Sequence, residues 1–151
     1  MLTQQIKESI DKSILCWLAT ANINGAPNVS PKEIFTYHDD HYIIIANIAS
    51  PQSIDNIKYN PQVCISFIDI LIQRGWQLKG TAELIEREEP TFELFESPLL
   101  KMTEGKFPFS TIIKMKVHET KPIWAPSYIF YPETTQQEQI EKALKSYSLK
   151  K

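Results

Sequence analysis

Two prolines, Pro51 and Pro61, bracket one short segment and limit what it can become. Ser50 stands directly before Pro51, a pair typical of an N-cap followed by proline at the first helical position. Asn60 stands before Pro61, and a residue before proline is pushed out of the α region. The segment is therefore predicted to be a helix of little more than two turns. The apolar run 42–46 that leads into it predicts a strand.

The start of this helix is a candidate anion site. Ser50 precedes it, and Gln52 and Ser53 lie in its first turn. Free backbone N–H groups, hydroxyl donors and the positive end of the helix dipole converge at such a start. An ordinary capped helix without a ligand explains the same residues, so this segment alone leaves both interpretations open.

Short segments with alternating apolar and polar residues fill most of the remaining chain. Strands are predicted at 14–21, 27–37, 42–46, 62–69, 76–85 and 111–120. Asn24-Gly25 between the first two predicts a hairpin, because both residues tolerate positive φ. Gly80 inside the fifth strand predicts a bulge or a close approach of two backbones. Six mostly antiparallel strands with short turns predict a small barrel.

Helices are predicted at the periphery of this barrel, at 2–12, 90–102 and 134–147. Each carries a stripe of apolar residues at helical spacing. Pro98 is expected to break or kink the second helix, and Thr134 or Thr135 is expected to cap the third. We expect a single domain over 1–151, with its core at 10–125 and the C-terminal helix at 134–147.

Composition argues against several classes of function. The chain has a net charge of −2 and a pI of about 5.9, so no large basic surface for nucleic acid or an anionic membrane is expected. It shows no signal peptide and no apolar segment long enough to span a bilayer, so a cytoplasmic protein is expected. Cys16 and Cys64 lie in apolar runs and are expected as buried free thiols.

Candidate catalytic and metal-binding side chains are few. No serine elbow, zinc or Walker pattern occurs, and the stretch 38–41 (HDDH) is expected to be a solvated turn. No catalytic residue and no metal site are therefore predicted. Ser30, Pro31 and Lys32 mark an irregular place in the second strand, because proline inside a strand favours an edge or a bulge. An anion site with little protein-borne acid–base chemistry suits a bound cofactor.

Three stretches occur in a fixed order: 18–32 (LATANINGAPNVSPK), then Ala46-Asn47 before the serine-rich turn and helix, then 77–83 (QLKGTAE). Together they resemble the pyridoxamine 5'-phosphate oxidase-like family of FMN-binding split barrels. The resemblance covers about residues 10–87, and the tail 127–140 is also similar to that of small flavin-binding members. It implies a mainly β (α+β) fold, a six-stranded antiparallel split β-barrel with peripheral helices. It also implies a homodimer with FMN in a groove between the subunits.

The resemblance implies a set of cofactor-binding residues drawn from three strands, one helix start and the aromatic segment near the end. They are Val29, Ser30, Pro31, Lys32, Ala46, Asn47, Ser50, Gln52, Ser53, Gln77, Lys79 and Trp124. Vitamin B6 oxidases commonly carry an Arg-Lys pair where Gln52 and Ser53 stand. This lower charge implies either weaker FMN binding or a site completed by Lys58 or Lys32. The tail also lacks the basic residues of those oxidases, so vitamin B6 oxidase activity is not expected.

The leading hypothesis is an FMN-dependent oxidoreductase that exchanges hydride between the flavin and NAD(P)H or a small organic substrate. FAD and F420 are the less favoured cofactors. A flavin-binding module without turnover, used for storage or sensing, is the second hypothesis. A cofactor-free β-barrel interaction protein is the third.

Overall fold

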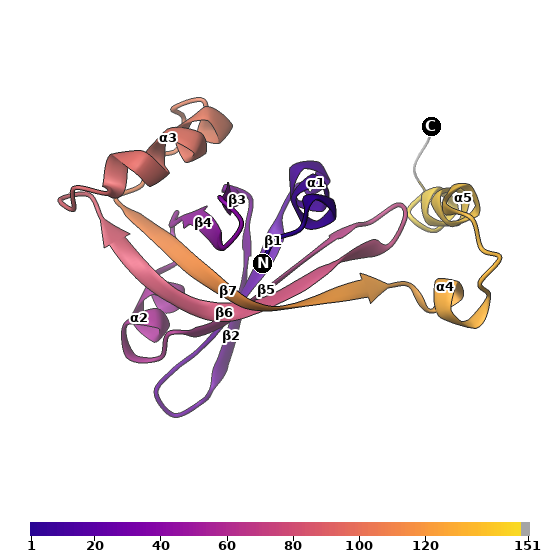
Figure 1. Ribbon diagram of the computed structural model, residues 1–151, viewed down its shortest axis with the longest axis horizontal. Coiled ribbons are helices and arrows are strands. Elements are labelled where there is room, and N and C mark those ends of the chain that lie inside the picture. Colours follow the sequence, from indigo (N-terminus) through magenta and orange to yellow (C-terminus); the bar gives the residue numbers. More distant parts are fainter. Residues whose placement is uncertain (149–151) are drawn as a thin grey trace.

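One antiparallel sheet forms the body of the computed structural model, which describes residues 1–148 (Figure 1). Its seven strands follow the order β2-β1-β5-β6-β7-β4-β3. They are β1 (Cys16–Ala21), β2 (Pro27–Lys32), β3 (Phe35–His38), β4 (Tyr42–Ala46), β5 (Gln62–Asp69), β6 (Arg74–Glu86) and β7 (Thr111–Trp124). β2 and β3 form the two edges of the sheet, yet only Glu33 and Ile34 separate them in the chain. The sheet must therefore curl until its edges meet, which confirms the expected mainly β split barrel.

The strand predicted over 27–37 is two strands in the structure. The chain bends at Glu33 and Ile34, directly after Pro31 and Lys32. The backbone N–H of Ala46 donates to the carbonyl oxygen of Ile34 at 3.0 Å, which ties the bend to the end of β4. The one predicted strand thus becomes β2 at one edge of the sheet and β3 at the other. The number of strands therefore rises from six to seven.

The hairpin between β1 and β2 is confirmed, with a different turn geometry from the one expected. Only Gly25 adopts positive φ, at 82°. The side-chain oxygen of Asn22 accepts from the backbone N–H groups of Asn24 at 3.0 Å and Ala26 at 2.9 Å. The loop is therefore closed by an asparagine side chain and needs one glycine.

Gly80 lies where the two longest strands, β6 and β7, shift their register. A Cβ atom on Gly80 would stand 1.9 Å from the carbonyl oxygen of Lys116, so no larger residue fits without moving a backbone. The predicted bulge at this glycine is confirmed. It sharpens the local twist of the ribbon that β6 and β7 form.

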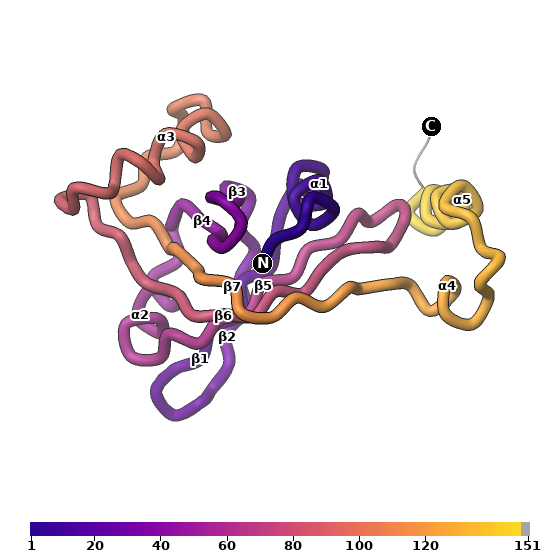
Figure 2. Tube along the Cα trace, viewed as in Figure 1, coloured from indigo at the N-terminus to yellow at the C-terminus, as the bar shows by residue number. Residues whose placement is uncertain are grey.

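The helices are α1 (Gln4–Lys12), α2 (Pro51–Tyr59), α3 (Phe92–Thr103), α4 (Pro126–Phe130) and α5 (Gln136–Ser146). α1 packs against the inner face of the sheet, whereas α3, α4 and α5 lie toward its ends (Figure 2). Pro98 lies inside α3 without ending it, and α4 has no counterpart among the predicted helices. Thr135 caps α5 in a capping box with Glu138, as expected. None of the helices in residues 1–148 is both long and apolar enough to cross a membrane.

Two apolar clusters fill the structure. The first packs Ile6 and Ile10 of α1 against the inner face of the curled sheet, and the second packs α3 against β4, β6 and β7. Cys16 is buried in the first cluster, as expected. Cys64 is only partly buried, because its position on β5 faces the outer side of the sheet. Both cysteines are free thiols.

Candidate functional site

The start of α2 lies against the end of β2. The Lys32 ammonium donates to the hydroxyl of Ser50, and the hydroxyl oxygens of Ser30 and Ser53 are 3.2 Å apart. Lys32 and Ser53 are buried, with 4% and 1% of their surface exposed. Residues predicted for one site from two separate segments thus meet. We call Ser30, Lys32, Ser50 and Ser53 the α2 cluster.

Ser50 occupies the N-cap position of α2 and precedes Pro51, as predicted, but its side chain makes no capping hydrogen bond. Its hydroxyl instead donates to the carbonyl oxygen of Ile48 at 3.4 Å and accepts from Lys32. The expected side-chain cap is therefore wrong, because the lysine takes the oxygen. The backbone N–H groups of Gln52 and Ser53 find no acceptor among the described residues. They leave the positive end of the helix dipole open to an anion.

Lys32 carries a buried charge without a counterion. Burial lowers the pKa of its ammonium, because a low dielectric disfavours the charged form. Cys16 is its cross-strand neighbour on β1. Burial raises the pKa of the Cys16 thiol to about 12, an effect that the nearby Lys32 opposes. The thiol is therefore neutral at physiological pH, and Lys32 forms no ion pair within residues 1–148.

Asn47 presents an unsatisfied acceptor at the end of β4. Its side-chain oxygen is buried and has no hydrogen-bond partner in the described chain, a condition that only the Nε atom of Arg74 shares. Its backbone N–H donates to the carbonyl oxygen of Thr111 at 3.0 Å, which fixes the residue in place. A buried acceptor without a donor costs about 1–3 kcal/mol. A ligand with a suitably placed N–H would remove this cost.

A cavity of about 220 Å³ opens beside the α2 cluster. It is lined by Pro31, Lys32, Glu33, Ile34, Ala46, Ile48 and Phe107. Most of these side chains are apolar, and Lys32 brings the buried charge to one side. The combination suits a flat apolar ring attached to an anionic group better than a bare anion.

Other predicted site residues face away from the α2 cluster. Val29 and Pro31 alternate with Ser30 and Lys32 along β2, and Val29 is 56% exposed. Gln52 is exposed, and its side-chain N–H donates to a side-chain oxygen further along α2. Pro31 lines the cavity of about 220 Å³, whereas Val29 and Gln52 do not.

Gln77, Lys79 and Trp124 lie on the long ribbon of β6 and β7. Gln77 and Trp124 line a shallow cavity of about 530 Å³ together with Lys121, and Lys79 pairs with Glu119 at 3.3 Å. β1 and β5 separate β6 from β2 in the sheet. Three strand spacings amount to about 14 Å. Within one chain, therefore, these residues do not join the α2 cluster.

The two lysines considered as counterions for the phosphate are clearly separated by the structure. Lys58 is in the last turn of α2, where it lies 3.9 Å from the carboxylate of Asp55. Lys32 contacts Ser50 at the first turn. Only Lys32 is therefore placed at the positive end of the helix.

Residues missed by sequence reasoning complete the surroundings. Asn56 is buried on α2 and donates to the hydroxyl of Thr20 at 2.9 Å. The helical spacing of Gln52, Ser53 and Asn56 is a polar stripe that could have revealed it. Phe107 comes from the loop after α3, and no local pattern links it to the cavity.

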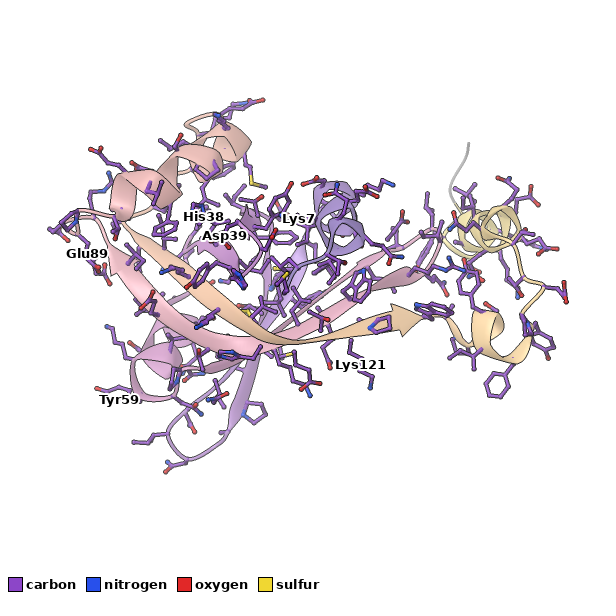
Figure 3. All side chains as sticks on the ribbon, in the orientation of Figure 1. Lys7, His38, Asp39, Tyr59, Glu89 and Lys121 are labelled. Carbon is purple, nitrogen blue, oxygen red and sulfur yellow. The ribbon has the colours of Figure 1, made fainter. Side chains whose placement is uncertain are left out.

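Residues 39–41 form the turn between β3 and β4, as expected, but His38 is the last residue of β3, and its ring centre lies 5.0 Å from that of Phe95. Asp40 in this turn pairs with Lys7 of α1 at 2.6 Å, and Figure 3 shows Lys7 close to the turn. Residues 1–148 contain no group of three His, Cys, Asp or Glu side chains that could hold a metal ion.

Comparisons with known proteins place the fold. Residues 2–123 match the family profile described as pyridoxamine 5'-phosphate oxidase. HupZ from Group A Streptococcus is 27% identical, with a TM-score of 0.68 over 80% of this chain and 92% of that one. An FMN-binding protein from Syntrophomonas wolfei is 16% identical, with a TM-score of 0.68 over 81% and 86%. An F420 reductase is 20% identical, with a TM-score of 0.62 over 80% and 98%. No curated protein matches the chain.

Proposed function

Because the chain belongs to the pyridoxamine 5'-phosphate oxidase family, we propose that it binds FMN at the α2 cluster and acts as an FMN-dependent oxidoreductase. The observation that carries this proposal is the buried ammonium of Lys32. It lies at the start of α2, without an ion-pair partner among residues 1–148. A phosphate at this place receives a charge-assisted hydrogen bond and the free N–H groups of the helix.

The chain's own groups divide the work of binding. The α2 cluster holds the phosphate through Lys32, the hydroxyls of Ser50 and Ser53, and the helix N–H groups. The apolar walls around Ala46 and Ile34 receive the ring system and exclude water from it. The unpartnered side-chain oxygen of Asn47 accepts from a ring N–H, which orients the ring.

When bound, FMN supplies hydride exchange with NAD(P)H or a small organic substrate. The residues near the cavity offer position and polarity for this chemistry, and no catalytic acid or base is assigned. An F420 reductase among the structural neighbours has the same fold. F420 is therefore the alternative cofactor that an experiment has to exclude.

A homodimer would bring residues that lie far from the α2 cluster within one chain close to the α2 cluster of the other chain. The cavity of about 220 Å³ is smaller than the usual ligand pocket of about 300–1,000 Å³. Gln77 and its cross-strand neighbour Lys121 line an open surface on the face of the ribbon opposite Trp76. We place Gln77 of a second copy over the ring that the first copy holds. Exposed apolar residues on the outer face, Trp17 at 48% and Val29 at 56%, support burial of this face in the assembly.

Purification and spectroscopy test the proposal. A yellow protein, with one FMN identified by mass in the released pigment, supports it, whereas colourless protein that takes up no added FMN contradicts it. Anaerobic bleaching of the bound flavin by NADH or NADPH separates an oxidoreductase from a storage or sensing module. Mass measurement of the assembly by light scattering checks the dimer.

A further inference from the structure

A second cavity, of about 290 Å³, lies at the other end of the sheet. α1 and α5 flank it, and the hairpin of β5 and β6 forms its floor, on the side of the ribbon where α1 lies (Figures 1 and 2). Lys121, beside Gln77 on the outer face, projects away from α1 in Figure 3. None of the residues of the α2 cluster lines this cavity. We call it the Arg74 pocket, after the residue that dominates it.

Arg74 is held between two aromatic rings. The central carbon of its guanidinium lies 4.1 Å from the ring centre of Tyr128 and 5.2 Å from that of Trp124. The Tyr128 hydroxyl donates to the carbonyl oxygen of Ile72 at 2.7 Å, and the N–H of Ala125 donates to another carbonyl of the hairpin turn at 3.0 Å. α4 is thereby fastened to the turn that carries Arg74. The guanidinium is preorganised, and its terminal nitrogens, unlike the buried Nε, are the donors that can meet a ligand.

No other group in the described chain uses these donors. The Nε atom of Arg74 is buried without a hydrogen-bond partner, and Arg74 forms no ion pair within residues 1–148. The other arginine of the chain provides a contrast. Arg87 also lies over an aromatic ring, Phe92 at 4.8 Å, but it pairs with Glu96 at 3.1 Å and donates to a backbone carbonyl at 2.6 Å. An aromatic platform without a partner is thus particular to Arg74.

The charges around the pocket restrict the ligand. Lys12, in the last turn of α1, is a second cation without an ion pair in the part of the chain described. Two carboxylates also line the pocket: Asp69 accepts from two backbone N–H groups of the turn, and Glu8 accepts from the side chain of Gln4 at 3.2 Å. Both carboxylates repel a dianion in the pocket. A monoanion meets the cations with the least repulsion.

We propose that the Arg74 pocket binds a small flat carboxylate, with the carboxylate on the guanidinium of Arg74 and the apolar body beside Trp76 and Trp124. Arg prefers planar carboxylates, to which it donates two parallel N–H bonds. The indoles of Trp76 and Trp124 provide apolar contact for a ring. The site is separate from the proposed flavin site, and its test does not depend on flavin chemistry.

Benzoate is the probe, and the indole N–H resonances of the chain's three tryptophans report where it binds. Protein saturated with FMN, or as purified if it takes up none, is titrated with benzoate, with its neutral analogue benzamide and with phenyl phosphate. We expect saturable shifts of Trp76 and Trp124, with Trp17 on the outer face unmoved. Benzamide and phenyl phosphate should each bind at least about tenfold more weakly than benzoate.

The substitution Arg74→Met should abolish the benzoate shifts, while the control Arg87→Met should leave them intact. Circular dichroism verifies that both variants fold. If Arg74→Met does not fold, the titration of the unsubstituted protein with the three probes still tests the proposal. Equal binding of benzoate and benzamide, unchanged binding to folded Arg74→Met, or tighter binding of phenyl phosphate would each overturn the proposal. Displacement of benzoate by FMN would overturn the separation of the two sites.

Discussion

The α2 cluster and the Arg74 pocket each contain a cation without an ion pair, but the environment of the charge differs between the two regions. Lys32 is almost fully buried in its cluster, and burial lowers the pKa of its ammonium. Arg74 is only partly buried and rests on two aromatic rings that stabilise its charge. Two carboxylates, Glu8 and Asp69, line its pocket, whereas one, Glu33, lines the cavity beside the α2 cluster.

The difference assigns different ligands to the two regions. A desolvated lysine at a helix start, where free backbone N–H groups also point, favours an anion of high charge such as a phosphate monoester. A stacked arginine with carboxylates nearby favours a flat monoanion. If the two regions are independent, a substitution in one should leave ligand binding in the other unchanged.

The largest expected effect follows substitution of the buried serine of the α2 cluster. Ser53→Glu places a carboxylate against the proposed phosphate, and repulsion between like charges should weaken FMN binding by at least about 100-fold. Benzoate binding in the Arg74 pocket should not change. Fluorescence titration of both ligands measures this. The control is Ser97→Glu at an exposed position of α3, and unchanged FMN affinity in folded Ser53→Glu would refute the phosphate site.

Removal of the buried charge should affect stability and binding in opposite directions. Lys32→Met eliminates a desolvated ammonium, so we expect the melting temperature of the flavin-free protein to rise by about 2–4 °C for each kcal/mol gained. FMN affinity should fall by about 10- to 100-fold through loss of a charge-assisted hydrogen bond. Thermal denaturation and titration check the two effects. A clear loss of stability would mean that Lys32 holds the fold together through Ser50.

The lowered pKa of Lys32 predicts a pH dependence of flavin binding. Phosphate binds the charged ammonium, so FMN affinity should decline as pH rises through the folded-state pKa toward the ordinary lysine value of about 10.4. The stability of the flavin-free protein should rise over the same range, because the unfolded chain holds the proton more tightly. Both trends should weaken in Lys32→Met. A flat affinity profile in the unsubstituted protein would argue against contact between Lys32 and the phosphate.

The smallest effect is expected at the edge of the cavity. Phe107 is 53% exposed, so Phe107→Ala should leave the melting temperature nearly unchanged. Loss of its ring from the cavity wall should weaken FMN binding by about threefold to tenfold. Isothermal titration measures this, with Phe130→Ala on the exposed surface of α4 as the matched control. An equal effect of both substitutions would exclude a specific role for Phe107.

The two regions also differ in how far the sequence reveals them. The α2 cluster comes from two nearby segments, whose Ser-Pro, proline-bearing strand and Asn-Pro signals act locally. The Arg74 pocket combines α1, the β5–β6 hairpin, β7 and α5, and no local pattern unites them. The bend at Glu33 and Ile34 was missed for a similar reason: it joins two sheet edges that come together only after the whole sheet has curled.

Single residues also show that local sequence patterns do not predict tertiary contacts. The roles of Gly80 and Thr135 follow from local backbone geometry and were predictable. The hydroxyl of Ser50 was expected to cap its own helix, but Lys32 reaches it from another strand. Local rules therefore predict the strands and most helices, whereas tertiary contacts decide which side chain a polar group meets.

Comparison of FMN with riboflavin tests the central claim most directly, because the two ligands differ only in the phosphate. If the α2 cluster holds the phosphate, the protein should bind FMN at least about 100-fold more tightly than riboflavin, or about 2.7 kcal/mol. This preference should shrink sharply in Lys32→Met. Equal affinity for FMN and riboflavin in the unsubstituted protein would contradict a phosphate site at the start of α2.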